Sequence, residues 1–352
     1  MKLLILTQKV NRTDPILGFF HRWIEEFAKQ HCESVIVVCL QEGEHNLPEN
    51  VRVLSLGKEV GASRFAYVAR FYGYIWGERK NYDAVFVHMN PVYIVLGGIF
   101  WRIMGKKIGL WYAHKSVDLK LRIAEKLAHI VFTTAPESFQ LKSKKVNIMG
   151  HGIDIESFKC EDMKNDSDNT IIEILHVGRI TPIKNIDILI EAARILKETW
   201  EHTFHIALIG GPATASDFGY KRELTALIEK YGLQDTVTFE GDTPNMGMKS
   251  QYCRSDASIN LAPTGGVDKV VLESMAAGRP VFASNEAFRG YFGIYSKALL
   301  FKERDAEDLA AKIMTFFVAD DRDRVKACLL ENVRKTSNLQ QLINSILTLL
   351  YK

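Results

Sequence analysis

The stretch HVGRITPIKNIDILIEAARIL, residues 176–196, decides the fold of this chain. It overlaps the apolar run 171–177, which predicts a buried strand ending at Gly178, and it continues into an amphipathic helix. The loop between strand and helix holds Arg179 and Lys184. In an open α/β sheet, ligands bind where strands end and helices begin. Two cations at that place suit a phosphate or diphosphate, and the alternative is that both are ordinary surface charges.

The same alternation of apolar runs and amphipathic segments extends through the whole chain. We expect strands at 3–7, 34–40, 51–56, 84–88, 107–112, 130–134, 171–177, 203–209, 236–239, 257–261, 280–283 and 298–301. We expect helices at 19–29, 63–79, 118–128, 184–198, 218–231 and 338–352, and a further helix that begins at Pro91. Repeated strand–helix–strand units build parallel sheets that are covered on both faces. The class is therefore α/β, with two doubly wound Rossmann-like halves.

A polar stretch divides these halves. Residues 160–170, CEDMKNDSDNT, contain almost nothing apolar beyond Met163. The expected organisation is an N-terminal Rossmann-like domain, a linker, a C-terminal Rossmann-like domain and a last helix that packs back across the domain boundary. The corresponding ranges are 1–160, 161–170, 171–335 and 336–352.

Composition and cysteine usage restrict the class of protein. The chain has 352 residues, 47% of them apolar and 25% charged, which indicates about two globular domains rather than disorder. Its longest apolar stretch, 91–101, is about half the length of a membrane-spanning helix. The five cysteines are scattered and lack metal-ligand spacing. We therefore expect reduced thiols, no disulfide framework and a cytoplasmic location.

Two later loops each follow an expected strand and contain paired glycines. They are LIGGPATAS, residues 208–216, and the first part of LAPTGGVDKVVLESMAAGRPVFAS, residues 261–284. The paired glycines are Gly210, Gly211, Gly265 and Gly266. Glycine lets backbone amides approach a phosphate, and the helix after the second loop carries Glu273, a carboxylate suited to a ribose hydroxyl pair. The alternative for Glu273 is an ordinary helix-surface carboxylate.

Four stretches between 151 and 284 resemble the motifs of one family. They are HGIDIESF at 151–158, the VGR-loop-K segment at 177–184, GDTPNMGMKSQYCRSDASINLAPT at 241–264 and LESMAAGRPVFAS at 272–284. The chain is similar in these to the retaining nucleotide-sugar glycosyltransferases that build bacterial polysaccharides and glycolipids. The resemblance implies the GT-B fold, in which two Rossmann-like domains face a cleft.

The resemblance also implies a set of site residues. It gives catalytic roles to His114, Arg179 and Lys184, the two cations stabilising the departing diphosphate. The implied nucleotide-sugar contacts are Gly18, Gly178, Gly210, Gly211, Gly241, Gly265, Gly266, Val267, Asp268, Lys269 and Glu273. The nucleotide diphosphate sugar is a co-substrate, so we expect no resident cofactor. We also expect no metal, because the two D-x-D patterns, at 166–168 and 321–323, follow no strand.

One position departs from the family pattern. The family usually shows Glu, seven residues, Glu, and counting back eight residues from Glu273 reaches Gly265. In the family that first carboxylate contacts the donor sugar. Asp268 and Lys269 lie nearby in the sequence and could take its place.

We therefore expect a hexosyl-type glycosyltransferase that acts with retention of configuration. Its donor would be a UDP-sugar or, second in order, a GDP-sugar, and its acceptor a glycan or a lipid-linked glycan. Two alternatives stay open: a nucleotide- or glycan-binding protein without turnover, and a related two-Rossmann sugar-nucleotide epimerase.

The charges predict where such a protein would work. Residues 1–150 hold 21 Lys and Arg against 13 Asp and Glu, and the rest hold 24 against 29. The segment SRFAYVARFYGYIWGERK, residues 63–80, interleaves basic and aromatic side chains, which suits the headgroup region of an anionic membrane. We expect this surface, and no nucleic acid, as a partner at the inner face of the membrane. The alternative is that these aromatics pack against the sheet.

Overall fold

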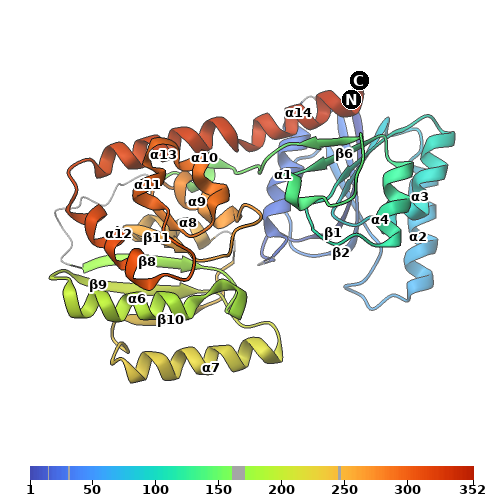
Figure 1. Cartoon of the computed structure of the whole chain (residues 1–352). Helices are drawn as coiled ribbons and strands as arrows, with labels where there is room; N and C mark the ends of the chain where they lie inside the picture. Colours follow the sequence, from blue (N-terminus) through green and yellow to red (C-terminus); the bar gives the residue numbers. More distant parts are fainter. Residues whose placement is uncertain (15, 31, 161–170, 245–246) are drawn as a thin grey trace. The chain divides into compact units, whose positions relative to one another are not determined.

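The structure, a computed structural model, describes residues 1–14, 16–30, 32–160, 171–244 and 247–352. The chain separates into two compact units. Unit 1 comprises residues 1–152 with 339–352, and unit 2 comprises residues 153–338 (Figure 1). The predicted linker, 161–170, lies outside the described residues.

Unit 1 is built on a seven-stranded sheet in which all neighbouring strands are parallel. Its order is β3-β2-β1-β4-β5-β6-β7, which reverses direction between β1 and β4 as in a doubly wound fold. The strands are β1 (Lys2–Val10), β2 (Ser34–Glu42), β3 (Val51–Ser55), β4 (Ala84–His88), β5 (Lys107–Trp111), β6 (Ile130–Thr133) and β7 (Val146–Ile148).

Alternate residues of the strands supply the two cores of unit 1. Leu3 and Ile5 of β1 face one helical layer, whereas Leu4 and Leu6 face the other, because successive strand residues point to opposite faces. The first layer contains α1 (Gly18–Lys29) and α14 (Leu339–Tyr351). The second contains α2 (Arg64–Gly77), α3 (Val92–Ile103) and α4 (Leu119–Leu127). The 3₁₀ turn η1 (Pro136–Ser138) follows β6.

The C-terminal helix α14 returns to unit 1 after the chain has completed unit 2, as predicted. Its apolar side chains at helical spacing, Leu342, Ile343 and Ile346, are buried against unit 1. The Tyr351 hydroxyl donates to the Lys2 carbonyl oxygen at 2.8 Å. The first strand and the last helix are thereby joined.

Unit 2 is a second parallel sheet, of five strands in the order β10-β9-β8-β11-β12. The strands are β8 (Ile171–Val177), β9 (Thr203–Ile209), β10 (Val237–Gly241), β11 (Ala257–Asn260) and β12 (Val281–Ala283). Its longer helices are α6 (Ile186–Thr199), α7 (Ala215–Lys230), α8 (Met248–Arg254), α9 (Lys269–Ala276), α12 (Ala306–Val318) and α13 (Arg322–Thr336). Its short helices are α5 (Ile155–Phe158), η2 (Pro182–Lys184), η4 (Glu286–Phe288), α10 (Arg289–Phe292), η5 (Gly293–Tyr295) and α11 (Ser296–Leu299). The predicted α/β class with two doubly wound sheets is confirmed.

One predicted strand is wrong. Residues 298–301 do not form a strand, because Ser296–Leu299 form the short helix α11. Only a single bridge, between Ala283 and Leu300, connects this segment to β12. Leu299 is buried all the same, so the apolar run marked burial correctly. A run this short does not distinguish a strand from a helix.

The prediction of reduced cysteines is also wrong for one pair. Cys160 and Cys253 form a disulfide, with Cα atoms 5.6 Å apart, whereas Cys32, Cys39 and Cys328 are free thiols. The two partners are 93 residues apart in sequence, so their spacing gave no sign of the pairing. The argument for a reducing compartment from scattered cysteines therefore loses its support.

Candidate functional site

Three glycines meet at the carboxyl ends of β8, β9 and β10. The Gly178 amide donates to the Ile209 carbonyl oxygen at 2.9 Å, and the Gly210 amide donates to the Gly241 carbonyl oxygen at 2.7 Å. Gly210 has a φ of +126°, and a Cβ atom there would lie 2.1 Å from the Gly178 carbonyl oxygen. Position 210 therefore accepts only glycine, and this edge of the sheet presents closely packed backbone.

Beside these glycines, Lys184 is held against a carboxylate. Its ammonium lies 2.5 Å from Asp268, at the start of α9, and the Asn260 side-chain amide donates to the same carboxylate oxygen at 2.9 Å. Burial alone would raise the pKa of Asp268, but Lys184 and Asn260 lower it, so the carboxylate is charged. The structure thus brings together two residues that the sequence separates by 84 positions, Lys184 and Asp268.

A left-handed residue fixes the loop that carries Lys184. Asn185 has a φ of +48°, and its side-chain amide donates to the Leu261 carbonyl oxygen at 3.0 Å, tying the loop to the end of β11. Arg304, which the sequence analysis missed, donates to the Asn185 side-chain oxygen and lies 3.9 Å from Asp187. Arg179 is exposed on the same loop. Arg179 and Lys184 are therefore in the loop before α6, and Arg304 contacts the residues at the start of that helix.

Glu273 is buried in α9 with both carboxylate oxygens engaged. It is 3% exposed, one oxygen lies 2.8 Å from the Lys269 ammonium, and the other accepts from the Tyr252 hydroxyl at 3.1 Å. Burial, with the Glu273 charge, raises the pKa of Tyr252 well above its ordinary value, so the phenol stays protonated. Glu273 is therefore not the surface carboxylate of the alternative interpretation.

The Gly265–Gly266 loop is clamped by Asn285, another residue that the sequence analysis missed. The Asn285 side-chain oxygen accepts from the Gly265 amide at 3.4 Å, and its amide donates to the Gly266 carbonyl oxygen at 2.9 Å. Asn285 follows β12 and is fully buried. Val267, next in the loop, packs against the core. The backbone at position 265 is thus set by a side chain of the neighbouring strand exit.

A buried histidine lies beneath Gly178. The His176 ring bonds the Ile259 carbonyl oxygen through Nδ1 at 3.1 Å, and burial lowers its pKa to about 4. Within the part of the chain that the structure describes, its Nε2 and the Asn260 side-chain oxygen have no hydrogen-bond partner. The floor of the site therefore carries two buried acceptors beside the Lys184–Asp268 pair.

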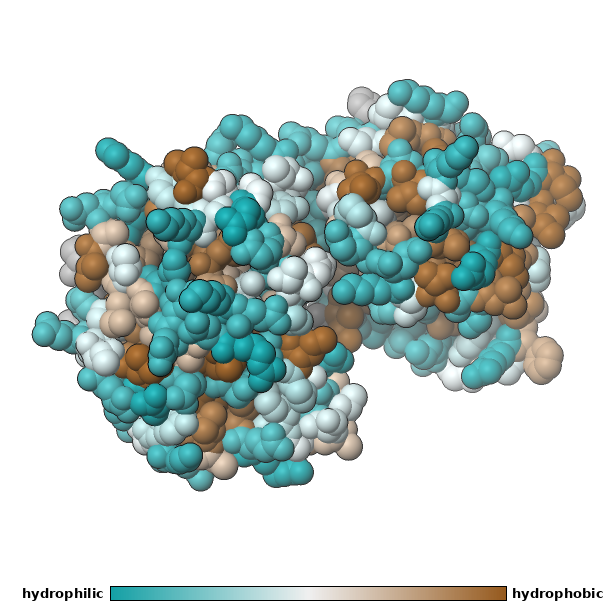
Figure 2. Space-filling view, in the orientation of Figure 1, coloured by the Kyte–Doolittle hydropathy of each residue, from teal (hydrophilic) through white to brown (hydrophobic). Residues whose placement is uncertain are grey.

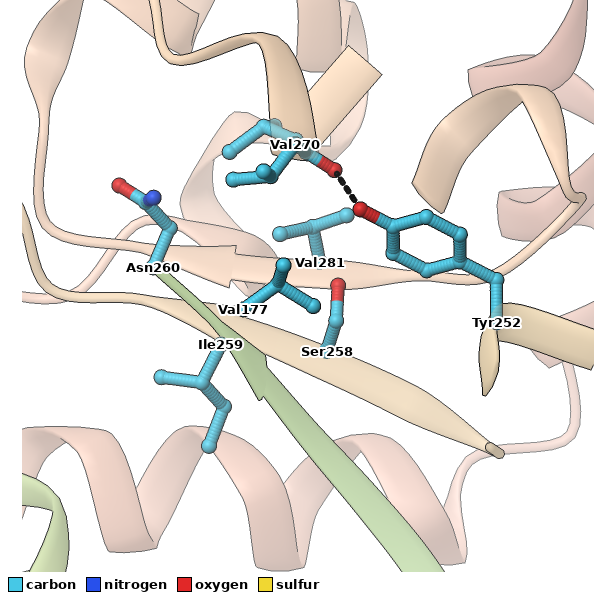
Figure 3. A pocket seen from close by; sticks show the side chains of 8 residues that line it. Val177, Tyr252, Ser258, Ile259, Asn260, Val270 and Val281 are labelled. Carbon is cyan, nitrogen blue, oxygen red and sulfur yellow. Dashed lines mark hydrogen bonds between the residues drawn. The ribbon is translucent and has the colours of Figure 1, made fainter. Parts of the chain in front are cut away.

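The cavity drawn in Figure 3 lies below this floor. Val177, Val270 and Val281 surround it, and the Tyr252 hydroxyl, which can share its one proton between Glu273 and the Val270 carbonyl oxygen, lies 3.2 Å from the latter. It has room for about one water molecule, so it is a packing gap rather than a nucleotide pocket.

The predicted residues of the N-terminal half lie in unit 1. His114 is exposed after β5, and its Nδ1 accepts from the Ser116 amide at 3.0 Å. Gly18 is the first residue of α1, and a Cβ atom there would lie 2.9 Å from the Arg12 carbonyl oxygen. Asp14 stabilises the preceding loop through the Leu17 amide and the Lys9 ammonium.

The two D-x-D patterns have different outcomes. Residues 166–168 lie outside the described residues, whereas Asp323, at the start of α13, pairs with Lys326 at 3.2 Å. In the ranges that the structure describes, no group of three His, Cys, Asp or Glu side chains could hold a metal ion.

Comparison with known sequences identifies the region around this site. Residues 159–327 match the family described as glycosyl transferases group 1. WcaL of Escherichia coli K12, named for colanic acid biosynthesis, is 29% identical over 185 residues, which cover 50% of this chain and 43% of WcaL. The D-inositol 3-phosphate glycosyltransferase of Frankia alni is 26% identical over 48% of this chain and 42% of its own length. The alignments thus span less than half of either relative.

Comparison with solved structures covers the whole chain. HepE of Anabaena in complex with UDP superposes with a TM-score of 0.75 at 18% identity, covering 100% of both chains. A sucrose-phosphate synthase of Thermosynechococcus elongatus gives 0.74 at 17% identity, covering 99% of this chain and 98% of the synthase. These matches confirm the predicted GT-B fold.

Proposed function

The chain belongs, through residues 159–327, to the glycosyl transferases group 1 family, and on this basis we propose that it transfers a sugar from a nucleotide diphosphate donor. We favour a UDP-sugar as the donor over a GDP-sugar. The transferred sugar keeps the anomeric configuration that it has in the donor. The acceptor is a glycan or a lipid-linked glycan of polysaccharide or glycolipid synthesis, met in the cytoplasm at the inner face of the membrane.

The observation that carries this proposal is the grouping around Lys184. Closely packed glycines end three neighbouring strands, and the Lys184 loop lies beside them with Arg179. Anionic groups bind at such strand ends because exposed amides and the start of a helix favour negative charge. A diphosphate matches this site in charge.

The proposed transfer reaction requires mainly that the protein position the donor and the acceptor. In transfer with retention, the leaving and attacking groups use the same face of the sugar, so the protein must hold both and stabilise the departing diphosphate. Arg179 offers a planar fork of donors and Lys184 a compact charge. These cations take the place of a metal in our proposal, so turnover should persist in excess EDTA.

The preference for a UDP-sugar has weaker support. The HepE structures, which have this fold, contain UDP, alone or with glucose. At 18% identity, this similarity supports the fold and not the identity of the donor. A donor screen by thermal shift addresses the preference directly. A ligand at 100 times its dissociation constant stabilises a protein by about 2.7 kcal/mol.

The alternative of binding without turnover also has specific support. Gly265 stands where the family has a carboxylate. Lys184 already forms an ion pair with Asp268, and Glu273 forms one with Lys269, so neither side chain is free for a ligand. A binding protein could keep all three features.

The deciding experiment measures release of free nucleoside diphosphate from candidate donors, with and without glycan acceptors. Acceptor-dependent release, with the product linkage in the anomeric configuration of the donor by NMR, is the expected result. Donor binding without release would support the binding protein. Conversion of the donor to an epimer without an acceptor would support the epimerase.

A further inference from the structure

Helix α2 carries a continuous exposed stripe of large apolar side chains. Phe65, Val68, Tyr72 and Trp76 are spaced by three or four residues, so they share one face of the helix. Their exposed fractions are 89%, 41%, 43% and 58%. Phe71 of the same helix is buried in the core. Both interpretations of the 63–80 sequence therefore hold in part, because some of its aromatic residues pack against the sheet and others are exposed.

The apolar surface continues onto α3, which lies beside α2, and onto α4, which packs on α3 in the same layer. The Tyr72 hydroxyl donates to the Leu96 carbonyl oxygen at 3.0 Å, and Arg102 of α3 donates to the Leu127 carbonyl oxygen at 2.7 Å. The outward apolar residues of these two helices are Ile99, Ile103, Leu119 and Ile123, which are 62%, 82%, 71% and 37% exposed. We call the exposed surface of α2, α3 and α4 the outer face; Figure 2 shows apolar side chains gathered in this region.

The outer face is strongly basic. The three helices contain six Lys or Arg residues, namely Arg64, Arg70, Arg102, Lys120, Arg122 and Lys126. Arg70 is turned away from the apolar stripe and donates to the Leu56 carbonyl oxygen at 3.0 Å, so five of the six contribute to the outer face. The single acidic residue of the three helices, Glu125, is half-buried and accepts from the Ser143 hydroxyl at 2.6 Å. At the end of α2, the Arg79 guanidinium lies 4.6 Å from the centre of the Trp76 ring, so charge and aromatic surface are adjacent.

We propose that the outer face of α2, α3 and α4 docks on an anionic lipid bilayer. Large apolar side chains exposed together on three adjacent helices mark an interaction surface, and basic side chains beside them match anionic headgroups. A second copy of the chain is a poorer occupant, because a symmetric contact would set this basic face against itself. No helix within the described residues is long and apolar enough to span a membrane, and the proposed contact requires none.

The proposal deepens the membrane location in the proposed function but does not depend on the transfer reaction. A basic residue close to an anionic leaflet strengthens binding about fivefold. The attraction is screened over about 8–10 Å at physiological salt, so binding should weaken as salt rises. Salt does not screen the insertion of apolar side chains into the bilayer. Mutations of basic residues and mutations of aromatic residues can therefore separate the electrostatic from the apolar contribution to binding.

The test is sedimentation of the full chain with vesicles, without donor or acceptor, so that its failure says nothing about catalysis. Vesicles of phosphatidylcholine that contain roughly 30% phosphatidylglycerol should bind the protein. Vesicles of pure phosphatidylcholine should bind it far less. Lys120→Gln with Arg122→Gln should weaken binding by roughly 25-fold at low salt, from about fivefold per charge. Phe65→Ser with Trp76→Ser should weaken binding at low and high salt alike.

The matched control is Phe218→Ser with Arg222→Gln on α7 of unit 2, where Phe218 is 53% exposed. It should bind vesicles as the parent chain does. Equal binding to both lipid mixtures, or an equal loss in the control, would overturn the proposal. So would self-association in sedimentation velocity that is abolished by Phe65→Ser with Trp76→Ser while lipid binding is absent.

Discussion

The Lys184 ammonium and the Asp268 carboxylate lie 2.5 Å apart, one before the start of α6 and the other at the start of α9. The cation that we propose for the diphosphate is therefore already paired with a carboxylate of the same unit. Both side chains are largely shielded from water, at 20% and 31% exposed, so the pair is stronger than a fully exposed one. An arriving diphosphate must share Lys184 with Asp268.

The first prediction follows from this competition. Asp268→Asn keeps the hydrogen-bonding shape but removes the negative charge, so free nucleoside diphosphate should bind roughly tenfold more tightly, a gain of about 1.4 kcal/mol. Isothermal titration calorimetry measures this. In the Lys184→Ala background the same change should have little effect. Unchanged or weaker affinity in the single variant would show that Asp268 helps to hold the ligand instead.

The second prediction concerns turnover. Arg179→Ala and Lys184→Ala should each lower the rate of transfer by roughly 10²–10³-fold, the cost of losing one preorganised donor to the departing group. Steady-state release of nucleoside diphosphate is the measurement, with Lys221→Ala on α7 as a control that should retain full activity. Near-parental rates in both site variants, with the fold intact by circular dichroism, would contradict their assignment.

The third prediction separates ribose from diphosphate. If Glu273 holds the ribose, Glu273→Ala should weaken binding of UDP but leave binding of pyrophosphate unchanged. In the structure, one Glu273 oxygen pairs with Lys269 and the other accepts a hydrogen bond from Tyr252. A ribose would have to share or displace these partners, so the test is demanding. Glu286→Ala, which removes an exposed carboxylate paired with Arg289, is the control. Equal UDP affinity in the parent and in Glu273→Ala would leave Glu273 a structural residue.

The sequence predicted this site in part. Strand ends and glycines are local signals, so the sequence could assign Gly178 and Gly210 each to a loop after a strand, whereas their contact with each other came from the structure. Partnerships between distant residues could not be predicted, because side-chain contacts between segments 84 or more positions apart leave no spacing pattern. Asp268 with Lys184, and Cys160 with Cys253, are of this kind. The strand predicted at 298–301 failed because four apolar residues indicate burial but not backbone conformation.

The fourth prediction tests the disulfide. Protein that is denatured without reductant should show three reactive thiols, and reduced protein should show five. Cys253→Ser should lower the free energy of unfolding of unit 2 by about 2–4 kcal/mol, because the cross-link restricts a long loop in the unfolded chain. Cys328→Ser should leave the disulfide and its contribution in place. Five thiols before reduction would mean that the pair does not form in the purified protein.

The last prediction concerns acid stability and comes from His88 in unit 1 and His176 in unit 2, the two most deeply buried histidines of the described residues. Burial lowers the pKa of His88 to about 3 and that of His176 to about 4, from 6.5 in an unfolded chain. His88 stacks on Phe20 with ring centres 3.8 Å apart, which leaves no room for a hydration shell around a charged ring.

Because both folded-state pKa values are depressed, the unfolded chain binds more protons than the folded one below pH 6.5. The stabilisation from these neutral rings is complete above pH 6.5 and is lost as the pH falls toward 4 for His176 and 3 for His88. Between about pH 6 and 4.5, His88 and His176 should each remove roughly 1.4 kcal/mol of unfolding free energy per pH unit from their own unit. His21 and His129, whose pKa values burial also lowers, add to the slope of unit 1. Urea titrations at a series of pH values measure this slope. His88→Phe should flatten the slope for unit 1 and leave that for unit 2 unchanged, whatever its effect on stability at pH 7. An equal slope in the parent and in His88→Phe would show that His88 does not titrate on unfolding.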